Sequence, residues 1–218
     1  MKNSNKFAIL AIAIAGTFAL SSCSKKDDND LTYGSNGSIK GTIKGISQDG
    51  QTLDESFSFS DVLPTAKYSN TVEDDTITST LSGTSIRTAV KDIHFSLMSE
   101  NVGSMSFDLI VQGTSVLTSQ FNSSVYSHQA SFNLNFTKDL GSGKVLSYTA
   151  SNYYIKRDPL TENFNPNNVT FTDFKYDETS GNVSGNYSII VTEVGANSLS
   201  HDATIAGSFS TKVYKKVN

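Results

Sequence analysis

Histidine, serine and carboxylate side chains are the groups of this chain that could do chemistry, and they are scattered along it. The histidines are His94, His128 and His201, which lack the short spacings common among zinc ligands. The nucleophile motif Gly-x-Ser-x-Gly is absent, and serine is so frequent that one serine near a histidine carries little information. Two distant acids could form a glycosidase pair, but nothing in the sequence selects them. We therefore predict no catalytic residue, no metal site and no cofactor.

Acidic residues form three groups that could hold calcium, because calcium prefers several oxygen ligands on one constrained loop. None has the spacing of a known calcium loop, and the stretch 177–182 lacks the later glutamate of an EF-hand. We interpret all three groups as solvated turns. They are residues 27–30, residues 73–75, and the set Asp173, Asp177 and Glu178.

Cys23 is the only cysteine, so no disulfide can form within the chain. It follows a segment with the three parts of a secretory signal. Lys2 and Lys6 precede an apolar run, residues 7–20, which is followed by small residues. The run is short for a membrane-spanning helix, which needs about 20 apolar residues.

Residues 20–23 read Leu-Ser-Ser-Cys and resemble the lipobox of bacterial lipoproteins. The resemblance implies cleavage between Ser22 and Cys23, so that residues 1–22 are a signal peptide. It also implies acylation of Cys23, which would tie the mature chain to a membrane through lipid. A lipid anchor would explain why a secreted chain carries one unpaired cysteine.

Lys25, Lys26, Asp27 and Asp28 come directly after the cysteine. They resemble the short Lys-plus-acidic export signal of surface-exposed lipoproteins in the Bacteroidota phylum. This resemblance implies an outer-membrane lipoprotein that faces the cell exterior. The alternative is a plain solvated tether, residues 23–37, that holds the domain off the membrane on the periplasmic side.

Residues 75–77, Asp-Thr-Ile, resemble the O-glycosylation site that exported proteins of the same phylum carry. The resemblance makes Thr76 a candidate for sugar attachment. It also implies that this part of the chain lies at the surface.

Alternating apolar and polar residues predict β-strands with one face on a core and one face in water. No long segment has the 3.6-residue period of a helix, so we expect few helices. The clearest strands are residues 93–97, 105–111 and 132–136. Weaker candidates are residues 38–46, 56–60, 76–81, 116–121, 145–155, 169–176, 183–194 and 203–214.

Turn residues separate these segments, for example Gln-Asp-Gly at 48–50 and Gly-Ser-Gly at 141–143. Short connections favour antiparallel neighbours, and we expect the last three strands to form a meander. The sequence predicts one all-β domain, residues 38–218, of roughly 8 to 11 antiparallel strands. The pattern alone leaves a β-sandwich and an up-and-down β-barrel equally open.

A longer irregular segment runs over residues 156–168 and contains Pro159 and Pro166. Loops of this length often carry function, although they also serve as plain crossovers with aromatic residues packed inward. Tyr153, Tyr154 and Phe164 lie just before or within it. These three residues are our candidate ligand surface.

Three functions remain open from the sequence. The first is a non-enzymatic binding or adhesion module, with an extracellular glycan or protein as its partner. The second is a β-barrel or sandwich around a small apolar ligand or lipid, with a cavity lined by Phe95, Phe107 and Phe136. The third is a hydrolase whose catalytic residues converge from distant positions. The net charge of −4 argues against nucleic acid as a partner, and the oligomeric state stays open.

Overall fold

Alternation along the sequence produces strands with one buried and one wet face, as β8 (Ser131–Gly141) shows in the computed structural model. Phe132, Leu134 and Phe136 are buried, whereas the two asparagines between them are exposed. The side chains of a strand point alternately to its two faces, so this pattern fixes which face meets the core.

The structure describes residues 37–47, 49–62, 70–81, 84–122, 129–194 and 200–216. All of them belong to one compact unit. Their secondary structure is β-strand with three short 3-10 helices and no α-helix.

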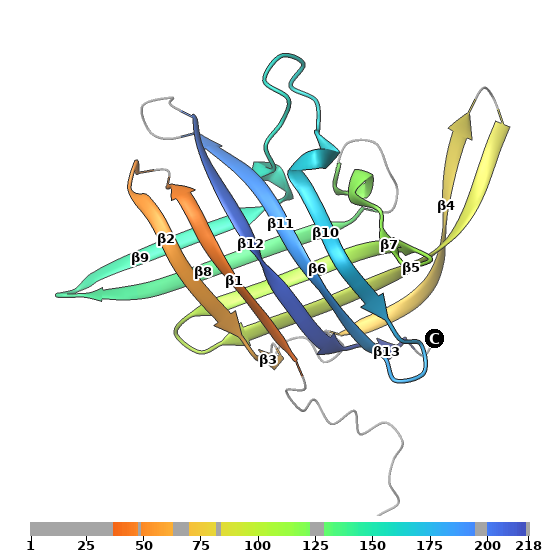
Figure 1. Cartoon of the computed structure of the whole chain (residues 1–218), viewed down its shortest axis with the longest axis horizontal. Helices are drawn as coiled ribbons and strands as arrows, with labels where there is room; N and C mark the ends of the chain where they lie inside the picture. Colours follow the sequence, from red (N-terminus) through yellow and green to blue (C-terminus); the bar gives the residue numbers. More distant parts are fainter. Residues whose placement is uncertain are drawn as a thin grey trace, which may run out of the picture. The chain divides into compact units, whose positions relative to one another are not determined.

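Two sheets contain all the described strands (Figure 1). The five-stranded sheet has the order β10, β11, β12, β1 and β2. The main path of the eight-stranded sheet is β13, β4, β5, β6, β8 and β9, with β3 paired to β5 and β7 paired to β6. The bounds are β1 Ser38–Ile46, β2 Thr52–Phe59, β3 Asp61–Val62, β4 Thr71–Leu81, β5 Thr84–Ser99, β6 Gly103–Gln112, β7 Ser115–Val116, β8 Ser131–Gly141, β9 Lys144–Ser151, β10 Val169–Tyr176, β11 Asn182–Val194, β12 Ser200–Lys212 and β13 Tyr214–Lys215.

The two sheets pack face to face as a β-sandwich and do not close into a barrel. This outcome decides between the two architectures that the sequence left open. Ten of the described strands have eight or more residues, and β10, β11 and β12 form the expected antiparallel meander. Every described pair is antiparallel except the two-residue pairing of β13 with β4.

Aromatic side chains fill the space between the sheets around Phe209 of β12. Its ring centroid lies 5.0 Å from that of Phe95 and 5.9 Å from that of Phe107, both on the opposite sheet. On its own sheet, Phe209 lies 6.3 Å from Phe171 and 6.4 Å from Tyr187. Aromatic pairs at such separations contribute about 0.5–1.5 kcal/mol each beyond the area they bury.

Facing glycines let these rings approach the backbone. Gly41 of β1 pairs with Gly207 of β12. A Cβ on Gly41 would lie 2.6 Å from the Tyr187 hydroxyl and 2.7 Å from the Phe57 ring. The Tyr187 hydroxyl donates a hydrogen bond to the Lys40 carbonyl at 3.2 Å. Burial raises the pKa of this hydroxyl, which therefore stays protonated.

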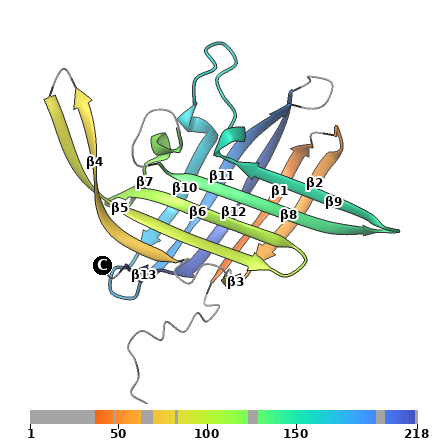
Figure 2. The ribbon, with the colours of Figure 1, turned by 180° about the vertical axis from the view of Figure 1, so that it is seen from behind.

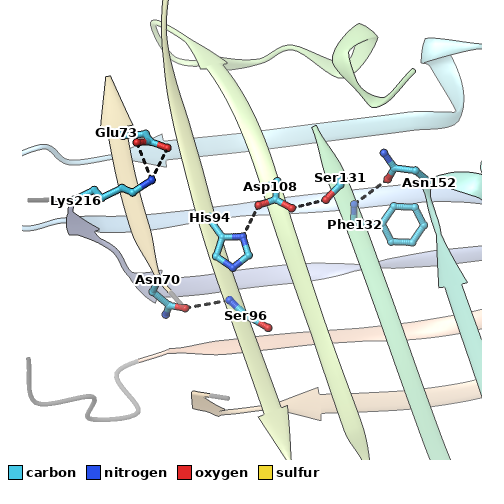
Figure 3. Close-up of polar contacts among 9 residues, drawn as sticks. All are labelled: Asn70, Glu73, His94, Ser96, Asp108, Ser131, Phe132, Asn152 and Lys216. Atoms are coloured by element: carbon cyan, nitrogen blue, oxygen red, sulfur yellow. Dashed lines mark hydrogen bonds and ion pairs between the residues drawn. The ribbon is translucent and has the colours of Figure 1, made fainter. Parts of the chain in front are cut away.

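Asn70 joins the two sheets through a buried side chain (Figure 3). Its Oδ1 accepts the backbone N–H of Ser96 on β5 at 3.0 Å. Its Nδ2 donates to Thr211 Oγ1 at 3.1 Å and to the Lys212 carbonyl at 3.3 Å, both on β12. The backbone carbonyl of Asn70 accepts from the N–H of Tyr214 on β13. One amide thus satisfies backbone groups of both layers at the edge where the chain changes sheet.

Several of the expected strands have different ends in the structure, and three of them change their course. The segment 116–121 is not a strand beyond Val116: it turns into a 3-10 helix, Thr118–Phe121, because Gln120 and Phe121 bury their side chains in a tight turn. The segment 145–155 leaves its strand at Ser151 and continues as a second 3-10 helix, Asn152–Tyr154.

The last expected strand, residues 203–214, is two strands. β12 ends at Lys212, Val213 is buried, and β13 then pairs with β4 of the other sheet. β4 and β5 are also longer than expected, beginning at Thr71 and Thr84. Their additional residues, 71–75 and 84–92, include four acids and two bases and do not alternate clearly.

Replacing Asn70 with alanine should lower the free energy of unfolding by about 3 kcal/mol, because the Ser96 N–H and the Lys212 carbonyl would lose their buried partner. Urea unfolding followed by circular dichroism measures the change. The control is Asn135→Ala on the exposed face of β8, which should stay within about 0.5 kcal/mol of the wild type. Equal losses from both variants would contradict the bridging role of Asn70.

Candidate functional site

An open groove of about 1110 Å³ lies at one end of the sandwich. The end of β1, the 3-10 helix Asn152–Tyr154, the loop that follows it, and the adjoining ends of β11 and β12 line the groove. This is the region around Tyr153 and the irregular segment 156–168 that the sequence singled out. Among the described residues, its lining is Ile46, Tyr153, Tyr154, Ile155, Lys156, Arg157, Asp158, Pro159, Glu162, Thr192, Ser200, His201 and Asp202.

The three aromatic candidates lie in different environments. Tyr153 is 80% exposed. Tyr154 and Phe164 are partly buried and pack against the core. The two tyrosine rings meet edge to face, with centroids 5.2 Å apart and planes at 90°. The groove therefore holds Tyr153 and Tyr154, but Phe164 is not among its lining residues. Tyr153 therefore exposes an aromatic face to solvent, and its ring packs against the ring of Tyr154.

Backbone and side-chain amides hold the groove wall in place. The Asn152 side chain accepts the Phe132 N–H at 2.9 Å (Figure 3) and donates to the carbonyls of Ala130 and Phe121. The 3-10 turn that presents Tyr153 is therefore tied to the start of β8.

Hydrogen bonds fix the loop that follows, residues 156–168, at both of its ends. The Lys156 N–H bonds to the Ile190 carbonyl, and Asn168 Nδ2 donates to the Lys156 carbonyl at 2.7 Å. A β-bridge joins Arg157 to Phe164. The segment 156–168 is thus irregular but well anchored.

Charged groups on the groove wall are largely paired within the protein. Lys156 Nζ contacts Asp202, which also accepts from Thr192 Oγ1 at 2.6 Å. Burial raises the pKa of Asp202, but the bonds from Lys156 and Thr192 outweigh burial and hold it below its usual value. Asp158 accepts the backbone N–H groups of Leu160 and Thr161, which lower the pKa of its carboxyl.

Arg157 and Glu162 also belong to the groove lining, and both are exposed. Arg157 Nη1 donates to the Glu162 backbone carbonyl at 3.3 Å, the one bond that this group of five donors makes among the described residues. The groove thus combines one open aromatic face, one under-used guanidinium, a carboxylate and the imidazole of His201. Such a set can bind a polar ligand that offers both donors and acceptors.

A second polar cluster lies on the outer face of the eight-stranded sheet, away from the groove residues. His94 of β5 and Ser131 of β8 both contact the carboxylate of Asp108 on β6 between them (Figure 3). His94 Nδ1 lies against Oδ1 and Ser131 Oγ donates to Oδ2. Burial raises the pKa of Asp108, but the bonds from His94 and Ser131 outweigh it and lower the pKa overall.

This cluster brings together a histidine and a serine that the sequence could not connect, but in the wrong order for acyl transfer. A serine nucleophile needs the imidazole as its base, with the carboxylate behind the imidazole. Here the Ser131 hydroxyl donates to Asp108 instead. Described residues also line two smaller surface pockets, one beside Lys91 and Tyr176 and one beside Glu100 and Thr137. None of the three residues of the cluster lines these pockets or the groove. Adjacent positions on paired strands could have suggested the contact, since His94 is directly opposite Asp108 and Asp108 opposite Ser131.

Asp92 lies two residues before His94 on the same strand face. Burial raises the pKa of Asp92 to about 6, and the negative charges of Asp108 and Glu73 add to the shift. Glu73 is directly opposite Asp92 on β4 and pairs with Lys216 at 3.1 Å (Figure 3). The ionised form of Asp92 therefore destabilises the folded state near neutral pH.

Two of the acidic groups considered for calcium lie in the described ranges, and they are not all the expected solvated turns, because residues 73–75 belong to β4 and Asp173 belongs to β10. Lys91 Nζ lies 2.8 Å from both Asp74 and Glu178, which raise its pKa, and it lies 5.9 Å from the Tyr176 ring centroid. Asp177 accepts from Ser180 Oγ and from backbone N–H groups of its own turn. In the part of the chain that the structure describes, no group of three or more His, Cys, Asp or Glu residues is arranged to hold a metal ion.

Several sequence predictions concern residues outside the described ranges. These are the cleavage site, Cys23, the stretch Lys25, Lys26, Asp27 and Asp28, and also His128. Thr76 is among the described residues. It is exposed on β4, and its N–H donates a hydrogen bond to Asp75 Oδ1. Its modification stays a prediction. Helices of the described residues are all too short and too polar to cross a membrane.

Comparison with known proteins gave no match to a family model, to a curated protein or to a solved structure.

Replacing Asp92 with asparagine should stabilise the protein at pH 7. The folded-state pKa of about 6 lies above the ordinary 3.8, so the folded chain holds this proton more tightly and loses stability as pH rises from about 4 to 6. After allowance for solvent screening, Asp92→Asn should gain about 1–2 kcal/mol at pH 7 and little at pH 4.

Urea unfolding at both pH values checks this expectation. Asp49→Asn, in an exposed turn, removes one carboxylate as the matched control and should not be more stable than the wild type at pH 7. An Asp92→Asn variant that is no more stable than the wild type at pH 7 would contradict the destabilisation assigned to ionised Asp92.

Proposed function

We propose that this protein is a lipid-anchored, non-enzymatic binding module displayed on the cell surface, and that the groove beside Tyr153 binds a glycan. The lipobox and the charged stretch behind Cys23 support the anchor and the address. The exposed aromatic face of Tyr153 within a polar groove is the observation that carries the binding role.

A sugar ring offers an apolar face of C–H groups and a rim of hydroxyls. The first suits stacking on an exposed aromatic ring, and the second suits planar polar side chains that donate and accept. Tyr153 supplies the ring at 80% exposure, and Arg157, Glu162 and His201 supply polar groups on the same lining. The edge-on contact with Tyr154 limits how far the Tyr153 ring can turn.

The charge of the groove favours a neutral glycan over an acidic one. Lys156 is neutralised by Asp202, and the exposed cation Arg157 lies on the same lining as the exposed carboxylate of Glu162. Among the described lining residues, no excess of positive charge is left for a sulfate or a uronate.

The packing of the interior supports a surface ligand over an enclosed apolar one. Phe95, Phe107 and Phe136, which would line such a cavity, make aromatic contacts at centroid distances of 5.0 to 6.3 Å. All three are buried in the continuous core, and none lines the described pockets.

Binding is tested with cells that express the full chain on plates coated with the neutral glycans mannan and xylan, and with heparin for comparison. We expect retention on a neutral glycan, and Tyr153→Ala should reduce it at least tenfold because the stacking face is lost. The matched control, Leu160→Ala, removes a 92% exposed side chain from the same loop outside the groove and should leave retention unchanged. Equal retention of the Tyr153→Ala and wild-type cells, or retention on heparin alone, would overturn the glycan assignment.

Surface display is tested by adding protease to intact cells that express the full chain. We expect the wild type to be digested and an Asp27→Ala, Asp28→Ala variant to be protected, because the acidic part of the export signal is lost. A Cys23→Ala variant should no longer partition with membranes. Protection of the wild type would place the domain on the periplasmic side and remove the ground for an extracellular partner.

A further inference from the structure

Beyond the sandwich, β4 and β5 continue as a two-stranded ribbon over residues 74–81 and 84–90 (Figures 1 and 2). β6 pairs with β5 only from Lys91 onwards. β13 covers the outer edge of β4 only at Thr71 and Val72. Both edges of the ribbon are therefore free of partners among the described strands.

The ribbon has little support from the core. Thr78 of β4 is exposed, as are Thr84, Ser85, Ile86 and Arg87 of β5. Ile77 and Val90 are the apolar side chains that bind it to the domain, the first only in part. A two-stranded ribbon alone in water is marginally stable, so an added strand would stabilise this one.

Two other edge strands of the sandwich are protected against pairing. On β10, a bulge between Thr172 and Lys175, with Asp173 at a positive φ, interrupts the ladder. The edge strand β2 carries two consecutive acids, Asp54 and Glu55. The edge of β4 differs: from Thr76 to Leu81 it has no charge, no proline and an unbroken register with β5. Proteins usually blunt an edge that is not meant to pair.

We propose that this edge of β4 pairs antiparallel with the same edge of a second copy of the chain, about a two-fold axis at Thr78. Such pairing places residue 75 of one copy opposite residue 81 of the other, so the acids at 73–75 never oppose each other. A pairing centred on residue 75 would oppose two aspartates. The β5 edge is less suited, because self-pairing centred on Arg87 would oppose two arginines. The result is a closed dimer with a four-stranded ribbon.

Disulfide cross-linking in cells that express the full chain tests the pairing. Antiparallel partners have Cα atoms about 4.5–5.5 Å apart, within reach of a disulfide. Three single-cysteine additions are compared after oxidation with copper phenanthroline: Thr78→Cys at the proposed axis, Ser85→Cys on the other ribbon edge, and Thr170→Cys on exposed β10. The unchanged chain sets the background from Cys23.

We expect at least tenfold more disulfide dimer with Thr78→Cys than with either of the other two variants. In detergent, sedimentation should show a dimer for the unchanged chain and a monomer for Thr76→Lys, Thr78→Lys, with the melting temperature of the sandwich preserved. No excess of dimer at residue 78, or sedimentation of the unchanged chain as a monomer, would overturn the proposal. Stronger linking between mixed Thr78→Cys and Ser85→Cys chains would also overturn it, because it would mean head-to-tail association.

Discussion

The aromatic packing around Phe209 is the interaction on which the rest of the structure depends. It joins rings from both sheets, so each sheet has one face committed to the core and the other free for polar groups. The facing glycines of β1 and β12 make room for Tyr187 and Phe57 within this layer. These rings occupy the space between the sheets, and the groove beside Tyr153 lies at one end of the sandwich.

Most of the fold could be predicted from the sequence because the alternation of apolar residues is a local property. The segments around Phe95, Phe107 and Phe132 show it plainly, and they became the central strands of one sheet. The choice between sandwich and barrel was not predictable, because it depends on whether the edge strands pair with each other. The tight turn after Leu117 was missed because its apolar residues mimic a short strand.

The candidate site was predictable only in part. Tyr153 and Tyr154 stood out because they precede a long irregular segment, and both line the groove. Their partners on the groove wall, Asp202 and Thr192, lie some forty residues further on and are brought close only by the pairing of β11 with β12. The contact of His94 and Ser131 with Asp108 likewise needs the register of three strands, which no short motif encodes.

The pairing of β1 with β12 has a consequence for how the chain folds. It joins Ser38 to Ser210, so the five-stranded sheet consists of the first two strands and of β10, β11 and β12 near the end of the domain. No amino-terminal part can complete this sheet before residue 210 has been made. Contacts of such large sequence separation slow folding, because the entropy of closing a long loop is lost before the pairing is gained. In a chain with this connectivity, the pair of β1 and β2 lacks its partner β12 until synthesis is almost finished, whereas β4 to β9 can pair with their sequence neighbours much earlier.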